Sequence, residues 1–216
     1  MKSKFGKQFN HNSQAGNYDN EVKNEDNPIR DGYQSVLLWV KNMMPSSGMA
    51  IELGCGTGNT TKVFSKNLAK IICVDISSEM IEIAKKKLKS KKIIFVEDDL
   101  LGFLSNYEGK DVDVIVSMYA IHHLTQKEKH RLFQESYNIL KDEGKIVFAD
   151  LMFQDREYKK EMIKKYPNLT EDFEAEFFWF IDEEVAILNN LGFVASVEKF
   201  SDLSWGIYGE KEVNKS

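Results

Sequence analysis

Residues 49–59 read MAIELGCGTGN, a short apolar run that leads directly into three glycines at alternate positions. The apolar run predicts a buried strand. The glycines predict a tight turn, because glycine accepts positive φ and lets a ligand approach main-chain amides. The next apolar run, residues 70–74, ends on Asp75. A carboxylate at the carboxyl end of a neighbouring strand can hold two ribose hydroxyls, so this stretch predicts a site for an adenosine-containing ligand.

The composition is that of an ordinary globular protein. Its 216 residues suit one domain with a small cap, and 42% apolar residues, including 14 Phe, can fill a substantial core. The 29 basic and 34 acidic residues give a formal charge of -5, which provides no broad attraction for nucleic acid or an anionic membrane. No apolar run is long enough to span a membrane, and the amino terminus lacks the apolar centre of a signal peptide. We therefore expect a cytoplasmic protein.

Two cysteines occur, Cys55 in the glycine turn and Cys73 in the strand that precedes Asp75. Two cysteines in these places indicate neither a disulfide framework nor a metal cluster, and no sequence motif indicates metal dependence. The sequence therefore predicts no metal site.

The chain alternates apolar strands with amphipathic helices from residue 49 onward. Further strands are predicted at residues 93–96, 112–117 and 145–149. Single helices between near-continuous apolar strands predict a mostly parallel α/β sheet covered by helices on both faces. The last apolar runs, 193–200 and 203–208, are separated by two residues, so they can only pair as an antiparallel hairpin.

The sequence divides into an amino-terminal helical cap, residues 1–45, and a core, residues 46–216. Residues 1–17 are polar and have little to bury, so they are expected to be mobile unless a ligand or cap orders them. In the rest of the cap, Asn27 and Pro28 predict the start of an amphipathic helix.

A segment of about residues 151–181 interrupts the alternation and carries an acidic and aromatic run. The aromatic residues of this run are Phe173, Phe177, Phe178, Trp179 and Phe180. They predict a lid over a small, partly apolar ligand, or else ordinary core or a dimer contact. Asp182 is the predicted cap of the helix that follows.

Five segments together resemble the class I S-adenosylmethionine-dependent methyltransferases. They are ELGCGTGN at 52–59, VDIS at 74–77, FVEDDL at 95–100, VDVIVSMYAIHHL at 112–124 and LKDEGKIVFAD at 140–150. The resemblance implies a Rossmann-like fold whose mostly parallel seven-stranded sheet ends in an antiparallel hairpin. More narrowly, the chain is similar to small bacterial methyltransferases with an amino-terminal tyrosine-aspartate motif, here Tyr18 and Asp19.

A nicotinamide-dependent oxidoreductase is the nearest alternative among enzymes, because it uses the same order of strand, turn and acid. Its fingerprint is G-x-G-x-x-G, and Asn59 occupies the position of the third glycine. Glu52 before the turn and the acids after the third strand favour the methyltransferase.

The resemblance implies a binding role for twelve residues toward S-adenosylmethionine. Asp75 would accept both ribose hydroxyls, and Asp99, with Asp98 as the alternative, would accept the adenine amino group. The turn would line the methionine part, and Tyr18 would close over it. The implied set is Tyr18, Glu52, Gly54, Cys55, Gly56, Gly58, Asp75, Ile76, Asp98, Asp99, Leu100 and Ser117. Taken singly, Glu52, the two acids and Ser117 could equally be structural residues.

Methyl transfer from a sulfonium needs alignment of the acceptor and exclusion of water more than it needs chemistry from side chains. A general base matters only when the acceptor carries a proton at the working pH. His122, His123 and Asp150 follow the fourth and fifth strands at the expected mouth of the site, so they are the candidate catalytic residues. For the two histidines, a structural role is the more common one.

Some acceptors can be excluded. The only prolines are Pro28, Pro45 and Pro167, so the chain lacks the Pro-Pro-aromatic motif of enzymes that methylate base amino groups. No cysteine is placed as the nucleophile of a pyrimidine-carbon methyltransferase. With the negative charge, this favours a small-molecule acceptor over nucleic acid and predicts no membrane partner. A monomer or homodimer is expected. The alternative from another class is a regulatory protein that binds S-adenosylmethionine without turnover.

Overall fold

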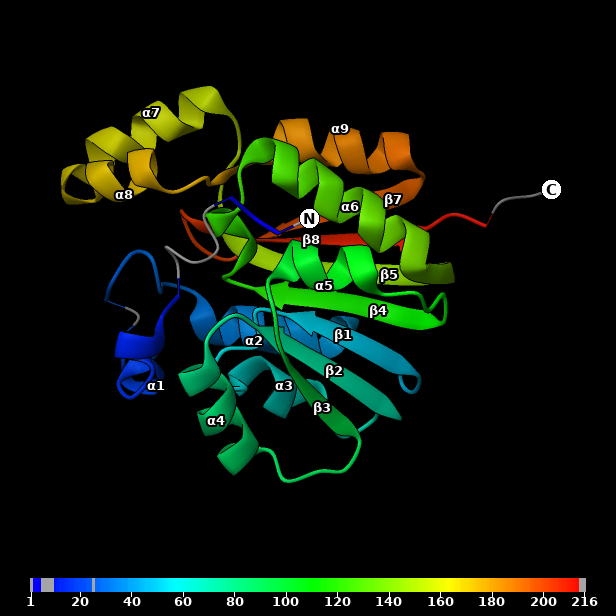
Figure 1. The fold of residues 1–216 in the computed structure, drawn as a ribbon. Coiled ribbons are helices and arrows are strands. Elements are labelled where there is room, and N and C mark those ends of the chain that lie inside the picture. The colour runs from blue at the N-terminus through cyan, green and yellow to red at the C-terminus, as the bar shows by residue number, and fades with distance from the viewer. Residues whose placement is uncertain (1, 5–9, 25, 214–216) are drawn as a thin grey trace.

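The computed structural model describes residues 2–4, 10–24 and 26–213 and shows one sheet between two layers of helices (Figure 1). The strands lie in the order β3-β2-β1-β4-β5-β8-β7, and the two-residue strand β6 also pairs with β5. The strands are β1 (Met49–Leu53), β2 (Lys70–Asp75), β3 (Ile93–Glu97), β4 (Val112–Met118), β5 (Leu140–Phe153), β6 (Trp179–Phe180), β7 (Phe193–Lys199) and β8 (Ser204–Lys211).

The sheet is mostly parallel and ends in an antiparallel hairpin. β1 to β5 pair in parallel, whereas β8 runs antiparallel to both β5 and β7. The predicted α/β fold class and the closing hairpin are confirmed. The pairing of β6 with β5 was not predicted, because two residues carry no readable periodicity.

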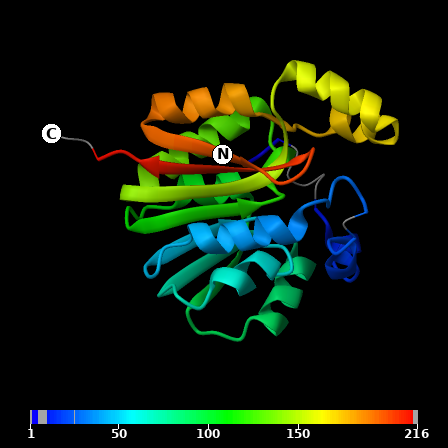
Figure 2. The ribbon, with the colours of Figure 1, turned by 180° about the vertical axis from the view of Figure 1, so that it is seen from behind.

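Helices cover both faces of the sheet. The helices are α1 (Tyr18–Glu21), α2 (Tyr33–Met43), α3 (Asn59–Phe64), α4 (Ser78–Lys87), α5 (Leu100–Asn106), α6 (Gln126–Ile139), α7 (Arg156–Lys165), α8 (Thr170–Ala175) and α9 (Ile181–Leu191), with 3-10 turns η1 (Asn12–Gln14), η2 (Ile121–His123) and η3 (Pro167–Leu169). Figures 1 and 2 show α5, α6 and α9 on one face and α2 and α3 on the other. Each face has its own buried cluster, to which Val36 of α2 and Phe133 of α6 belong respectively. None of the described helices is long and apolar enough to cross a membrane.

Two predicted helix starts were wrong. The first long helix begins at Tyr33 rather than at Pro28, because residues 27–31 form a separate turn and Gly32, at φ 80°, reorients the chain after it. The helix α9 begins at Ile181, so Asp182 lies inside its first turn instead of capping it.

The chain order creates a crevice at one edge of the sheet. From β1 the chain moves outward to β2 and β3, then returns to place β4 on the other side of β1. Ligands of open α/β sheets bind at the carboxyl ends of the strands where the order reverses in this way. α1, α7 and α8 lie beyond these carboxyl ends in both views (Figures 1 and 2).

Described parts of the amino-terminal segment lie across the same edge. The side-chain amide of Asn10 donates to the carbonyl of Ile76 at 3.4 Å, and the hydroxyl of Ser77 donates to Asn12. Residues 1–17 were expected to be mobile unless a ligand or cap orders them, because they have little apolar area to bury. Residues 1 and 5–9 of this stretch lie outside the described residues. In the structure, residues 10–12 make polar contacts just beyond the ends of the strands.

Candidate active site

The three glycines of the turn are all left-handed, at φ 73° for Gly54, 50° for Gly56 and 82° for Gly58. Their surroundings differ. A Cβ on Gly54 would collide with Ala120 after β4, and one on Gly58 would press against Leu88 just after α4. A Cβ on Gly56 would meet nothing within 4 Å. Two glycines therefore allow close packing, and Gly56 leaves open space at the surface of the crevice.

Asp75 ends β2 and binds the glycine turn. Its Oδ2 accepts the amide of Gly56 at 2.7 Å, and its Oδ1 accepts the amide of Ser77 at 2.9 Å. Burial raises the pKa of Asp75, and the two amides oppose the shift. Because each carboxylate oxygen has two lone pairs, one on each oxygen is left for hydroxyl donors.

The tyrosine-aspartate motif is attached to the same turn. Asp19 Oδ1 accepts the hydroxyl of Thr57 at 2.6 Å and the side-chain amide of Asn59 at 3.0 Å, and Asp19 also pairs with Lys87 of α4. Asn59, which stands where a dehydrogenase has its third glycine, therefore anchors the amino-terminal segment. This attachment directs Tyr18 into the crevice.

A cavity of about 390 Å³ occupies the crevice. Predicted residues that line it are Tyr18, Gly54, Gly56, Asp75, Ile76, Asp99, Leu100, His122 and His123. Residues from the amino-terminal segment and from the region of α8 complete the wall. The structure thus brings together most of the residues that the sequence assigned to an adenosine-containing ligand.

Asp99 caps α5 and faces the amino-terminal segment. Its Oδ1 accepts the amide of Gly102 at 3.0 Å and the amide of Ser3 at 2.9 Å, and its Oδ2 bonds to the Ser3 hydroxyl. Asp98 is turned away from the cavity and pairs with Lys2 at 3.4 Å. Of the two alternative acids, Asp99 is the one at the cavity.

The other predicted residues do not line the cavity. Glu52 is buried beneath the turn, where it accepts the hydroxyl of Thr61, and burial raises its pKa to about 8. Ser117 donates to the carbonyl of Leu53 at 2.8 Å. Cys55 lies in a small neighbouring recess. Gly58 packs against Leu88, and Asp98 pairs with Lys2. Asp150 is hydrogen-bonded to His122 and does not line the cavity itself.

At the far end of the cavity, His122 is held by Asp150. His122 Nδ1 lies 2.5 Å from Asp150 Oδ1, and the His122 amide donates to Asp150 Oδ2 at 2.9 Å. Asp150 is 1% exposed and also accepts the amide of Leu151 and the indole N–H of Trp179. With an N–H at Nδ1, the neutral imidazole carries its lone pair on Nε2.

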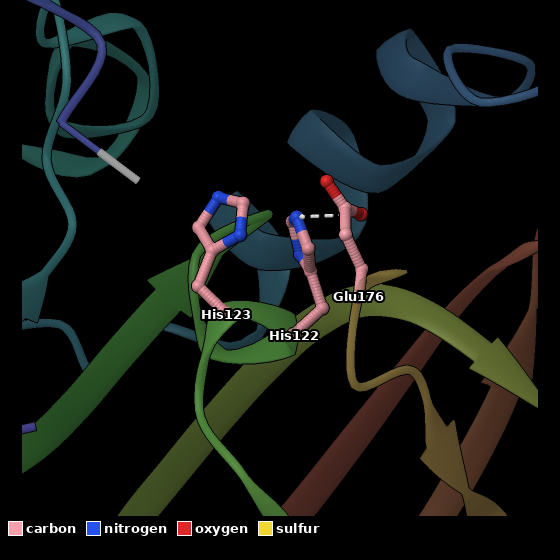
Figure 3. A group of neighbouring side chains, drawn as sticks. All are labelled: His122, His123 and Glu176. Carbon is pink, nitrogen blue, oxygen red and sulfur yellow. Dashed lines mark ion pairs between the residues drawn. The ribbon is translucent and has the colours of Figure 1, made fainter. Parts of the chain in front are cut away.

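Glu176, just after α8, lies on the open side of this imidazole. Figure 3 shows His122 between Glu176 and His123, and His122 Nε2 lies 3.6 Å from Glu176 Oε2. The rings of His122 and His123 are 4.0 Å apart between centroids. Burial, with His122 and His11 nearby, lowers the pKa of His123 well below its usual range, and burial raises the pKa of Glu176.

Sequence reasoning missed several residues of the cavity wall, among them His11, Arg30, Tyr119 and Glu176. The guanidinium of Arg30 lies 5.6 Å from the ring of Tyr18 and 5.8 Å from the ring of Tyr119. No carboxylate among the described residues pairs with Arg30 within 4.0 Å. Tyr119 adopts a left-handed φ of 53°, and its hydroxyl bonds Ser204 at 2.8 Å. Strained backbone of this kind is found more often at functional sites.

The arrangement can hold a polar ligand along one wall and react with it at the other. One end offers the buried carboxylate of Asp75 and the glycine turn, whose Gly54 and Gly56 line the cavity. The other end offers the imidazole of His122 and the carboxyl group of Glu176. A cation, Arg30, lies on the wall with them.

Comparison with known proteins gives a family match and similar relatives. Residues 50–144 match a family described as a methyltransferase domain. An uncharacterised methyltransferase of Alkaliphilus oremlandii is 34% identical over 207 residues, which cover 91% of this chain and 94% of the relative. One from Bacillus pumilus is 32% identical over 205 residues, 91% of this chain and 93% of the relative. A solved complex of a protein called DhpI with S-adenosylhomocysteine shares the fold, with a TM-score of 0.72 and 17% identity over 94% of this chain and 93% of that one.

Proposed function

We propose that this chain, which belongs to the class I S-adenosylmethionine-dependent methyltransferases, moves the methyl group of that donor to a small-molecule acceptor. The observation that carries the proposal is the single cavity of about 390 Å³, which joins the donor-type residues at one end to the histidines at the other. A volume of this order is usual for small-molecule sites. Membership of the methyltransferase family argues against the nicotinamide-dependent alternative.

The donor would lie along the carboxyl ends of β1 to β3. Asp75 would accept the ribose hydroxyls with its two remaining lone pairs, and Asp99 would accept the adenine amino group. Ile76 and Leu100 line the cavity between them and would contact the adenine ring. The methionine part would then lie near Gly54 and Gly56.

Arg30 would bind the carboxylate of the donor's methionine part. It is the only lysine or arginine among the described residues that line the cavity. It stands beside Tyr18, close to the glycine turn, and has no competing carboxylate within ion-pair distance in the described chain. A guanidinium is well suited to this role, because it binds a carboxylate through two parallel hydrogen bonds.

The acceptor would lie at the end of the cavity formed by His122, His123 and Glu176. Displacement on the sulfonium methyl requires the acceptor atom to be in line with the breaking S–C bond. Alignment supplies most of the rate increase, since effective molarities of well-oriented groups reach roughly 10⁵ to 10⁸ M. In this proposal His122 and His123 contact the acceptor, and Asp150 positions His122.

We also propose that residues 1–45 act as a cap and residues 151–181 as a lid. Asp172 and Glu176 of the second segment line the cavity. Its aromatic residues Phe173, Phe178 and Trp179 are buried in the core, so they would anchor the lid and leave acidic side chains to face the ligand. Slower tryptic cleavage of residues 156–175 in the presence of S-adenosylhomocysteine would support the lid, and unchanged cleavage would contradict it.

The test of the proposed function is a screen of small acceptors with the intact protein and S-adenosylmethionine. Formation of S-adenosylhomocysteine, followed by mass spectrometry, is the expected result for at least one acceptor. Tight donor binding without any turnover across a broad screen would instead favour the regulatory alternative. Loss of both binding and turnover would reject the donor site itself.

A further inference from the structure

Three side chains that offer nitrogen or oxygen ligand atoms converge at the acceptor end of the cavity, and a fourth, His11, lies beside one of them. One ligand atom each of His122, His123 and Glu176 lies within 4.8 Å of the other two (Figure 3). His11, from the amino-terminal segment, brings its Nε2 to 3.3 Å from the Nε2 of His123. These residues come from three parts of the chain.

Two of the imidazoles are fixed so that Nε2 carries a lone pair. His122 Nδ1 donates to Asp150 at 2.5 Å, and His11 Nδ1 lies 2.9 Å from the side-chain oxygen of Gln14. Because both oxygens accept, each Nδ1 is placed to donate its hydrogen, and Nε2 is the nitrogen that a neutral imidazole then offers to a metal. Histidines that bind metals are oriented in this way, with the second nitrogen donated to a carboxylate or carbonyl oxygen.

The spacing fits a metal better than it fits hydrogen bonds. Zinc bonds of about 2.0 to 2.2 Å in tetrahedral geometry separate neighbouring ligand atoms by roughly 3.3 to 3.6 Å. Two pairs match this spacing, His122 Nε2 with Glu176 Oε2 at 3.6 Å and His11 Nε2 with His123 Nε2 at 3.3 Å. Both distances exceed those usual for hydrogen bonds. The ligand atoms of His122, His123 and Glu176 lie within 4.8 Å of one another, so a metal would draw them closer together.

Burial and charge also suit a cation. The side chain of His122 is 7% exposed and that of Glu176 is 25% exposed, so little water competes for the ligand atoms. Glu176 supplies one negative charge, and the imidazoles are neutral ligands.

We propose that His122, His123 and Glu176, with His11 as the adjoining fourth ligand, bind one divalent transition metal ion, with Zn²⁺ as the expected occupant. Imidazole nitrogen with one carboxylate is a ligand set that zinc and its neighbours in the first row accept, whereas Mg²⁺ prefers oxygen. The site itself stands on the side-chain geometry. Its role in the reaction rests on the proposed function.

In that role the metal would bind the acceptor's reacting oxygen, nitrogen or sulfur atom in place of His11 or as an added ligand. Binding to the cation lowers the pKa of the acceptor, so its proton passes to water. The acceptor's electron pair then forms the new bond to the methyl carbon, the S–CH₃ bond breaks, and the sulfonium becomes a neutral thioether. No oxidant or reductant is needed.

A proton relay from the acceptor through His122 to Asp150 is the competing explanation. The relay requires His122 Nε2 to contact the acceptor and no other group. It gives no role to His11 or Glu176, although both side chains lie beside the histidine pair. The absence of metal binding would therefore favour the relay.

The test is calorimetric titration of tag-free, chelator-treated full-length protein with zinc chloride. We expect one Zn²⁺ per chain, and visible absorption bands of a four- or five-coordinate site after Co²⁺ is added instead. Glu176→Gln and His122→Gln are each expected to weaken Zn²⁺ binding at least tenfold, and His11→Gln to weaken it less and to alter the Co²⁺ spectrum.

His130→Gln is the matched control. His130 Nε2 lies 3.5 Å from Glu184 Oε2, so it forms a similar histidine-carboxylate pair outside the cavity, and it is the remaining histidine of the four in the chain. Its replacement is expected to leave Zn²⁺ binding unchanged. Circular dichroism and S-adenosylhomocysteine affinity, measured on each variant, show whether the variant is folded.

Failure to bind Zn²⁺, or binding that persists in Glu176→Gln and His122→Gln or disappears in His130→Gln, would overturn the proposal. Binding of Zn²⁺ without any binding of S-adenosylhomocysteine would leave the metal site standing and reject the proposed function. The two results are therefore distinguishable.

Discussion

The carboxylate of Asp75 accepts the backbone amide of Gly56 at 2.7 Å, so the end of β2 fixes the turn after β1. The same carboxylate is the proposed partner of the ribose. Replacement by Asn should lower the affinity for S-adenosylhomocysteine roughly 10- to 100-fold, because a hydrogen bond to a charged group contributes about 1.5 to 3 kcal/mol. Titration calorimetry measures this loss. Affinity within twofold of the native value in a folded Asp75→Asn variant would contradict the donor placement.

Asp99 and Asp98 can be distinguished by separate replacement. Asp99→Ala removes the proposed contact with adenine as well as the cap of α5, which contributes about 1 kcal/mol. We expect it to weaken S-adenosylhomocysteine binding and to lower Tm by roughly 2 to 4 °C. Asp98→Ala, whose side chain faces Lys2, should weaken binding less. The reverse order in calorimetry would assign the adenine contact to Asp98.

Arg30→Gln tests the contact with the methionine carboxylate. The variant should bind S-adenosylhomocysteine roughly tenfold more weakly, because a charge-assisted hydrogen bond is lost. It should bind 5′-methylthioadenosine, which lacks that carboxylate, as tightly as the native protein does. Lys41→Gln removes the same charge from an exposed position on α2 and is the control. Equal weakening for both ligands would mean that Arg30 acts on the fold of the site and not on the carboxylate.

Glu52 should make the protein less stable as the pH rises. Burial raises its pKa from 4.5 to about 8, so between these values the folded state keeps a proton that the unfolded state has released. Because the folded state binds more protons there, the free energy of unfolding falls as the pH increases. Below about pH 4.5 both states are protonated, and above about pH 8 the penalty is complete.

Glu52→Gln removes this titration. Urea unfolding at about pH 5 and about pH 9 should show a smaller loss of stability in the variant than in the native protein, by the order of a few kcal/mol at most. Identical pH profiles for the two proteins would show that Glu52 is ionised in the folded state at neutral pH.

Local patterns made much of the fold predictable. The apolar runs before Gly54 and up to Asp75 have the length of strands. The last two apolar runs are separated by only two residues after Phe200, so the two strands can pair only as a hairpin. Helix starts were less predictable. Asn27 and Pro28 have the pattern of a helix cap, but in the structure they begin a turn that ends before Gly32.

The candidate site was predictable only where it lies on these local patterns. Asp75 and His122 follow strands, so their place at the carboxyl edge could be deduced. Arg30 lies where a helix was wrongly predicted, and His11 and Glu176 lie in segments without periodicity. Only tertiary packing brings the three residues to the cavity. The proposed metal site could not be deduced from the sequence, because His11 and Glu176 each lie more than 50 residues from the histidine pair.

The amino-terminal segment crosses the edge of the sheet, and this has a consequence for the order in which the chain folds. Ser3 bonds a residue 96 positions later in the chain, and His11 contacts one 112 positions later. These two contacts can therefore form only when β3, β4 and η2 are already in place. Contacts over such long separations also close the largest loops, at the highest entropic cost. Attachment of the amino-terminal segment at Ser3 and His11 is thus expected to follow formation of the sheet.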